Sequence, residues 1–210
     1  MPEIILLATA HHYHLQWPHY SYQVLGDIIG AIRPAVICVE LDIAQLAARG
    51  SYEQPEYKEA ILPKAGELGC KLFPIKPIGE RPVNIEEVGV NPESLFGSIG
   101  LRLYSYCLST YIAWDYHQLC KSLKGIQSDH MDGLMRRKWL FAKMLLPERW
   151  RLWEAWNRKM ASAIAAAISD YPDSTILITV GLEHKYWLKE RLAKIPGVRL
   201  KQFSDIGFTG

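Results

Sequence analysis

The chain has 210 residues, of which 49% are hydrophobic and 22% are charged, and its formal net charge is +2. This length allows a domain with a sizeable core, and the composition is that of an ordinary globular protein. So small a net charge gives no reason to expect nucleic-acid binding. The one basic cluster, Arg136-Arg137-Lys138, runs directly into Trp139-Leu140-Phe141, which favours the solvated side of an amphipathic helix.

The sequence also gives no sign of export or membrane insertion. No basic segment precedes the short apolar run at the amino terminus, which is therefore interpreted as a strand and not as a signal peptide. The most hydrophobic later stretch, residues 95–119, contains Arg102, Asp115 and His117, so we expect a buried helix and no membrane span. The four cysteines form no CxxC pair and are expected to be reduced thiols of a cytoplasmic protein.

Five short runs rich in β-forming residues predict strands at residues 4–8, 35–41, 71–75, 175–180 and 198–203. The first, second and fourth are nearly continuous apolar runs, as expected for strands that are covered on both faces. Helical patterns with short joins separate most of the strands. We therefore expect an α/β fold, with right-handed crossovers and a mostly parallel sheet flanked by helices.

Three helical patterns connect the strands, at residues 22–32, 55–68 and 185–194, and Pro63 is expected to kink or break the second. Residues 91–170 contain no convincing strand and predict a helical insertion between the third and fourth strands. Within it, Pro147 suits the first turn of a long helix that runs to about Ser169. We interpret residues 1–210 as a single domain that contains this insertion.

Polar side chains follow three of the predicted strands, at the edge where open parallel sheets bind their ligands. His11 follows the first strand, Glu40 ends the second, and His184 follows the fourth. Each has a structural alternative: a loop histidine bonded to backbone, an ion pair with an arginine, and a histidine that caps a helix. His11 also belongs to a cluster of four histidines within nine positions, the others being His12, His14 and His19.

Two histidines and a carboxylate suit two kinds of chemistry. They could ligate Zn²⁺, Mn²⁺, Co²⁺ or Fe²⁺, and a water molecule on the metal would become a nucleophile near neutral pH. Without a metal, a histidine polarised by the carboxylate could act as a general base. The residues alone leave both open. Glu183 is a less favoured base, and Asp42 is expected to cap a helix over residues 43–48.

Both ends of the chain resemble the TraB/PrgY/GumN/TIKI group of the EreA/ChaN-like superfamily. The opening resemblance lies in A-T-A-H at residues 8–11 and R-P-A-V-I-C-V-E-L at residues 33–41. The closing resemblance lies in W-N-R-K-M-A at residues 156–161 and I-T-V-G-L-E-H at residues 178–184, which contains a G-x-x-H motif. Residues 55–75, beginning with Pro55-Glu56, resemble the group's glutamate-bearing helix and third strand. Residues 91–150 carry none of the resemblance.

This resemblance implies that His11 and His184 are the central site residues, with Glu40 as their carboxylate. It also implies that Arg158 is the family arginine, which would stabilise developing negative charge. The implied function is a metal-assisted hydrolase acting on a peptide or ester bond, using Zn, Mn, Co or Fe. The alternative is a non-enzymatic binder of a peptide, haem or other small ligand.

Three positions depart from the group's pattern. Ala8 replaces a glycine, Lys76 stands where an Asp-Arg pair is common, and Lys159 stands where Asp or Asn is common. A scaffold that has kept the fold and lost the chemistry therefore remains a third interpretation. Arg158 lies opposite the apolar face of its predicted helix, so an exposed arginine is its alternative. A homo-oligomer contact through exposed tryptophans is also open, although tryptophan is usually largely buried.

Overall fold

The structure is a computed structural model that describes residues 1–48, 54–77 and 95–208. It confirms the α/β class, because five parallel strands form one sheet in the order β3-β2-β4-β1-β5. The strands are β1 (Glu3–Thr9), β2 (Val36–Val39), β3 (Lys71–Pro74), β4 (Thr175–Gly181) and β5 (Arg199–Lys201). The side chains of β2 are all buried and those of β1 and β4 nearly so, which explains their continuous apolar runs.

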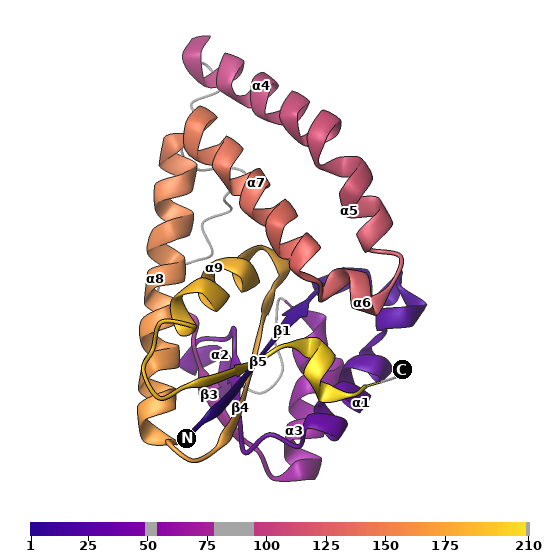
Figure 1. The fold of residues 1–210 in the computed structure, drawn as a ribbon, viewed down its shortest axis with the longest axis vertical. Helices are drawn as coiled ribbons and strands as arrows, with labels where there is room; N and C mark the ends of the chain where they lie inside the picture. Colours follow the sequence, from indigo (N-terminus) through magenta and orange to yellow (C-terminus); the bar gives the residue numbers. More distant parts are fainter. Residues whose placement is uncertain (49–53, 78–94, 209–210) are drawn as a thin grey trace.

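Helices cover both faces of this sheet. Figure 1 shows α1 and α3 on one side and α8 and α9 on the other. The α-helices are α1 (Tyr22–Ile32), α2 (Ile43–Ala48), α3 (Leu62–Leu68), α4 (Leu95–Tyr111), α5 (Ala113–Leu119), α6 (Leu123–Ile126), α7 (Asp129–Leu145), α8 (Pro147–Asp170) and α9 (Leu182–Leu192). The short helices are η1 (His11–Leu15), η2 (Pro18–Tyr20), η3 (Tyr57–Ile61, a π-helix) and η4 (Phe203–Ile206).

Two boundaries differ from the sequence-based prediction in a way that matters for the site. Strand β2 ends at Val39, so Glu40 lies just beyond the strand rather than inside it. Helix α9 begins at Leu182, three residues before the predicted start, because the backbone turns into the helix directly after Gly181. His184 therefore lies in the first turn of α9. The expected break near Pro63 is present, where the π-helix η3 gives way to α3.

The predicted insertion is helical where it is described, with α4 to α8 between β3 and β4; its first residues, 91–94, lie outside the described residues. Pro147 occupies the first turn of α8, as expected. Figure 1 shows α4 and α7 standing beyond the sheet, with α8 running back along it. Trp139 and Trp153 are buried inside this part of the molecule, so they pack as core residues.

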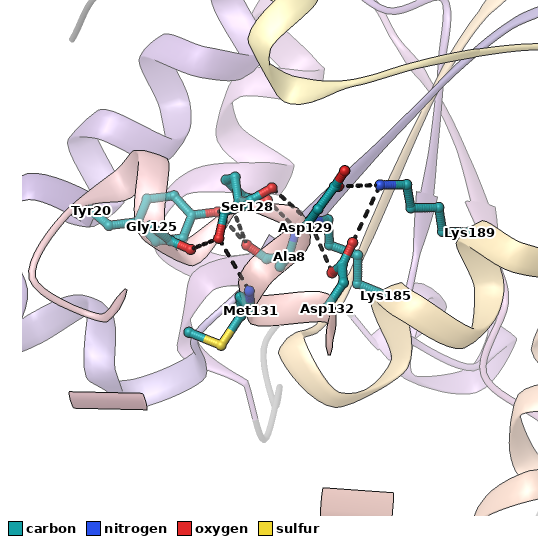
Figure 2. A network of polar contacts seen from close by, with 10 residues as sticks. Ala8, Tyr20, Gly125, Ser128, Asp129, Met131, Asp132, Lys185 and Lys189 are labelled. Carbon is teal, nitrogen blue, oxygen red and sulfur yellow. Dashed lines mark hydrogen bonds and ion pairs between the residues drawn. The ribbon is translucent and has the colours of Figure 1, made fainter. Parts of the chain in front are cut away.

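A polar network holds the insertion against the sheet (Figure 2). The side-chain amide of Gln127 donates to the Ala8 carbonyl oxygen at 2.9 Å, and its oxygen accepts the Ala8 N–H at 3.1 Å. The Lys185 ammonium donates to the Gln127 carbonyl at 2.9 Å and to Asp132 at 3.1 Å. The end of β1 and the first turn of α9 are thereby both tied to Gln127, which follows α6, and Lys185 is also tied to α7 through Asp132.

No helix within the described ranges combines the length and the apolar character that crossing a bilayer would need. All four cysteines are free thiols.

Candidate active site

The candidate site lies at the carboxyl edge of the sheet, around the reversal in strand order. From β2 the chain continues to β3 on one side, whereas from β4 it continues to β5 on the other. In open α/β sheets such a reversal opens a crevice outside the strand ends. Glu40 follows β2, Gly181 ends β4, and His11 lies two residues after β1. The topology therefore brings His11, Glu40 and the start of α9, which carries His184, to the same edge of the sheet.

His11 is held in an unusual backbone conformation. Its φ is 48°, in the left-handed region that side chains other than glycine adopt at a cost. This turn directs the ring toward Glu56, whose carboxylate oxygen lies 2.7 Å from Nδ1. The His11 side chain is 39% exposed, whereas that of Glu56 is fully buried. The strain is stored next to a buried charge, as is common at functional sites.

The pair His11–Glu56 shifts the titration of both groups. Burial would lower the pKa of His11, but the hydrogen bond and charge of Glu56, with the charges of Glu40 and Glu183, raise it above the usual histidine value. Burial would raise the pKa of Glu56, but the hydrogen bond and charge of His11 lower it. Glu56 is thus held ionised, and Nδ1 of His11 carries the proton that it shares with the carboxylate. In the neutral ring, Nε2 is then the basic atom.

Tyr57 connects Glu56 to the sheet. Its hydroxyl accepts the backbone N–H of Glu40 at 2.8 Å and donates to the Thr179 carbonyl at 3.4 Å. Tyr57 is fully buried and directly follows Glu56 in the chain. The helix that carries Glu56 is therefore fixed to the ends of both β2 and β4.

Glu40 is buried, and no arginine in the described parts of the chain pairs with it, unlike the ion pair that was its alternative. One of its oxygens accepts the backbone N–H of Gly181 at 3.0 Å. The other lies 3.9 Å from Nε2 of His184, which is too far for a direct hydrogen bond. The carboxylate thus links the end of β2 to the turn that leads into α9.

His184 is oriented by a neutral partner. Its Nδ1 lies 3.0 Å from Oδ1 of Asn157, and the amide nitrogen of Asn157 donates to the Trp153 carbonyl at 2.8 Å. With the amide assigned in this way, Oδ1 must accept and Nδ1 of His184 must donate. Trp153 also stacks on the His184 ring, with centroids 6.0 Å apart and planes 12° from parallel. Nε2 of His184 consequently faces Glu40.

Both imidazole rings border Gly181. A β-carbon at this position would lie 3.2 Å from Nε2 of His11 and 3.7 Å from Cδ2 of His184. The Nε2 sides of the two rings therefore face the same small region beside Glu40. Glycine is the residue that leaves this region free.

The remaining candidates lie elsewhere. Arg158 is exposed and pairs with Glu154 on its own helix at 3.0 Å, so the structure does not bring it to the histidines. The Glu183 carboxylate forms an ion pair with Lys138. Asp42 caps α2, as predicted, by accepting the backbone N–H of Gln45 at 2.7 Å.

Of the four clustered histidines, His11 contacts Glu56 and borders Gly181. His14 is buried, with Nε2 accepting the Ala10 N–H at 3.0 Å and Nδ1 donating to the Tyr20 carbonyl. Burial lowers the pKa of His14, although the hydrogen bond to Tyr20 opposes this effect, and the residue supports the turn as a neutral ring. His12 is exposed.

Sequence reasoning did not place Glu56 or Asn157 in the site. Glu56 lies within the resembling segment 55–75, but a distant carboxylate gives no sequence signal for the histidine that it contacts. Asn157 did carry a signal, because it shares the buried face of α8 with Trp153, Met160 and Ile164. A polar residue on an apolar stripe needs a hydrogen-bond partner, and here that partner is His184.

No protein-family model, curated protein or solved structure matched the chain. In the described parts of the chain, no three His, Cys, Asp or Glu side chains gather closely enough to form a metal site as they stand. The fold and the site geometry therefore define the protein as an α/β protein with two anchored histidines at the carboxyl edge of its sheet.

Proposed function

We propose that the chain is a hydrolase of peptide or ester bonds in which His11 acts as the general base. The observation that carries the proposal is the 2.7 Å hydrogen bond between Nδ1 of His11 and the buried Glu56. This bond orients the ring and makes Nε2 the atom that accepts a proton, on a side chain that water can reach. The resemblance of the two strand-to-histidine motifs supports hydrolysis among the reactions that use such a base.

In the proposed reaction, Nε2 of His11 takes a proton from water while the water oxygen forms a bond to the substrate's carbonyl carbon. The π electrons of the carbonyl group move onto its oxygen. When the tetrahedral intermediate collapses, the C–N or C–O bond breaks and the proton on Nε2 passes to the leaving amine or alcohol. Glu56 stays ionised throughout and stabilises the imidazolium, as the carboxylate does in a hydrolase triad.

The other residues of the site would position the reactants. Glu40 and the Nε2 atom of His184 lie beside the base and can hold the attacking water by hydrogen bonds. Helix α9 begins at Leu182 next to both rings, and the positive end of its dipole favours the negative charge that develops on the carbonyl oxygen. Arg158 has no part in this scheme because it points to another surface.

A divalent metal is a second proposal for the same site. Its donors would be His11, Glu40 and His184, whose chemistry suits Zn, Mn, Co or Fe. The observation that favours it is that Nδ1 of each ring is already anchored by a protein acceptor, as metal-ligating histidines usually are. A bound metal would polarise the carbonyl group or acidify water. The proton transfers above rest on the side chains alone.

The test compares His11→Gln with His12→Gln. His12 is the next residue and is exposed, so it controls for nonspecific catalysis by a surface imidazole. Protein purified without chelator would be assayed for hydrolysis of p-nitrophenyl acetate and of a quenched fluorescent peptide library, and for bound metal. We expect His11→Gln to lose about 10²–10⁴-fold in kcat/KM and His12→Gln to keep the parental rate.

Equal rates in the two variants would contradict the general-base role of His11. Stoichiometric binding of a peptide or of haem, with no turnover by the parent protein, would favour the ligand-binding alternative instead. For the metal, an equal metal content in the parent, His11→Ala and His184→Ala would contradict the second proposal.

A further inference from the structure

A second group of polar side chains lies beside His184, where α4, α7 and α8 meet the start of α9. Tyr104 comes from α4, Lys138 from α7, Arg149 from the first turn of α8, and Glu183 from α9. The Arg149 guanidinium carbon is 5.3 Å from the centre of the Tyr104 ring. The Lys138 ammonium forms an ion pair with Glu183. Glu183 directly precedes His184 in the chain, so the Lys138–Glu183 ion pair lies next to the proposed active site.

Buried hydrogen-bond donors without acceptors distinguish this region. Within the described chain, the buried side-chain atoms that lack a partner include the Tyr104 hydroxyl, Nε of Arg149, and the indole nitrogens of Trp139 and Trp153. All four can donate a hydrogen bond. Tyr104 is only 3% exposed, so bulk water does not compensate it. Buried donors are normally satisfied, and an acceptor supplied by a ligand would satisfy these.

The charges of the group favour an anion. The Glu183 carboxylate forms an ion pair with the Lys138 ammonium, so these two charges offset each other. Arg149 forms no hydrogen bond or ion pair within the described parts of the chain, and its charge is left over. One negative charge would neutralise the group.

Aromatic rings connect this group to the reacting residues. Trp153 lies one helical turn after Arg149 on α8 and stacks on His184. Trp153 also stacks on Trp139, with ring centroids 4.2 Å apart and planes 19° from parallel. Trp139 directly follows Lys138 in α7. A ligand group beside Arg149 would therefore lie close to the proposed hydrolytic centre.

We propose that Tyr104, Lys138 and Arg149 form a subsite for a carboxylate group of the substrate, namely the free C-terminal carboxylate of a peptide. A carboxylate is a planar acceptor that pairs with an arginine fork, and its single charge matches the one left over at Arg149. A phosphate dianion would exceed that charge. The inference rests on the proposed hydrolase function and specifies its substrate as a peptide cleaved near its carboxyl end.

The experiment compares N-acetyl-alanyl-alanine with its C-terminal amide as probes. Binding would be measured by calorimetry and tryptophan fluorescence on the full chain carrying His11→Gln, so that no turnover interferes. We expect the acid to bind at least about tenfold more tightly than the amide, the usual value of one charge-assisted hydrogen bond. Adding Arg149→Gln should abolish the difference, and Tyr104→Phe should weaken binding of the acid alone.

Arg151→Gln is the matched control, because Arg151 lies on the same helix, is exposed and pairs with Glu148. It should keep the preference for the acid. Equal binding of acid and amide, no binding of either, or a preference that survives both Arg149→Gln and Tyr104→Phe would overturn the inference. If the His11→Gln variant bound the acid selectively but the parent protein hydrolysed nothing, the proposed function would be contradicted and the subsite would stand. Hydrolysis without a preference for the free acid would contradict this subsite alone.

Discussion

The two strand-to-histidine junctions have similar sequences, but the structure treats them differently. After β1 the chain enters a left-handed turn at His11, and the ring is partly exposed and bonded to a charged carboxylate. After β4 it enters a regular α-helix at Leu182, and His184 is more buried, stacked on Trp153 and bonded to a neutral amide. Each ring is anchored through Nδ1 and presents Nε2 toward the site.

This difference indicates that the two histidines have different roles. A buried carboxylate partner stabilises the imidazolium, which a general base must become during the reaction. A neutral amide fixes the orientation of the ring without that charge, which suits a residue that positions water or a ligand. His11 would therefore transfer protons, whereas His184 would position the water or the ligand. Three substitutions test this comparison, in order of decreasing effect.

The largest effect is expected for Glu56→Gln. Glutamine keeps an acceptor near Nδ1 but removes the charge, so burial dominates and the pKa of His11 should fall. Because protonated His11 cannot accept a proton, parental activity should rise with pH through its raised pKa, and the variant should do so at lower pH. We expect kcat/KM at neutral pH to fall by about 10²-fold or more. The titration of the His11 ring protons by NMR gives a readout that is independent of activity.

Glu59→Gln is the control for this change, since Glu59 is an exposed carboxylate in the same helix. Its pH profile should match that of the parent. An unchanged His11 titration in Glu56→Gln would contradict the claim that the charge of Glu56 raises the pKa of His11.

A smaller effect, on stability, is expected for Asn157→Leu. The change removes the acceptor for Nδ1 of His184 and the hydrogen bond to the Trp153 carbonyl in a fully buried position. Leaving these groups unsatisfied should lower the free energy of unfolding by about 1–3 kcal/mol, measured by urea denaturation. Arg158→Ala, at the adjacent exposed position, should cost no more than about 0.5 kcal/mol. Similar losses for both would show that the amide does not anchor His184.

The smallest effect is expected for Gly181→Ala. The backbone there, with φ −57° and ψ 149°, accommodates alanine, so stability should change little. The added methyl group would press on Nε2 of His11 at 3.2 Å and shift that ring by a few tenths of an ångström. A misplaced base should lower kcat/KM by about tenfold. Gly66→Ala, in a helix with open space around the site of substitution, should leave the rate unchanged, and a parental rate in Gly181→Ala would place the reaction elsewhere.

Much of the fold followed from the order of apolar runs along the chain. Residues 22–32 were predicted with the bounds that α1 has, because a 3.6-residue stripe ended by Arg33-Pro34 is a local signal. The predicted start of α9 is three residues late, since Leu182-Glu183-His184 shows no apolar period. Arg158 shows that a sequence motif does not tell which of two adjacent helical residues faces the site. Successive residues of a helix point about 100° apart, and the packing of α8 directs Asn157 inward and leaves Arg158 exposed.

The sequence by itself determined that His11, Glu40 and His184 would lie at one edge, because each follows a strand and parallel strands end on the same side. Only the tertiary structure decided which groups anchor the two rings. Glu56 is 45 residues from His11, and Asn157 is 27 residues from His184. Contacts over such separations depend on how whole helices rotate and dock against the sheet, and no local pattern of residues encodes that docking. The chemical difference between two similar histidine motifs is therefore a property of packing.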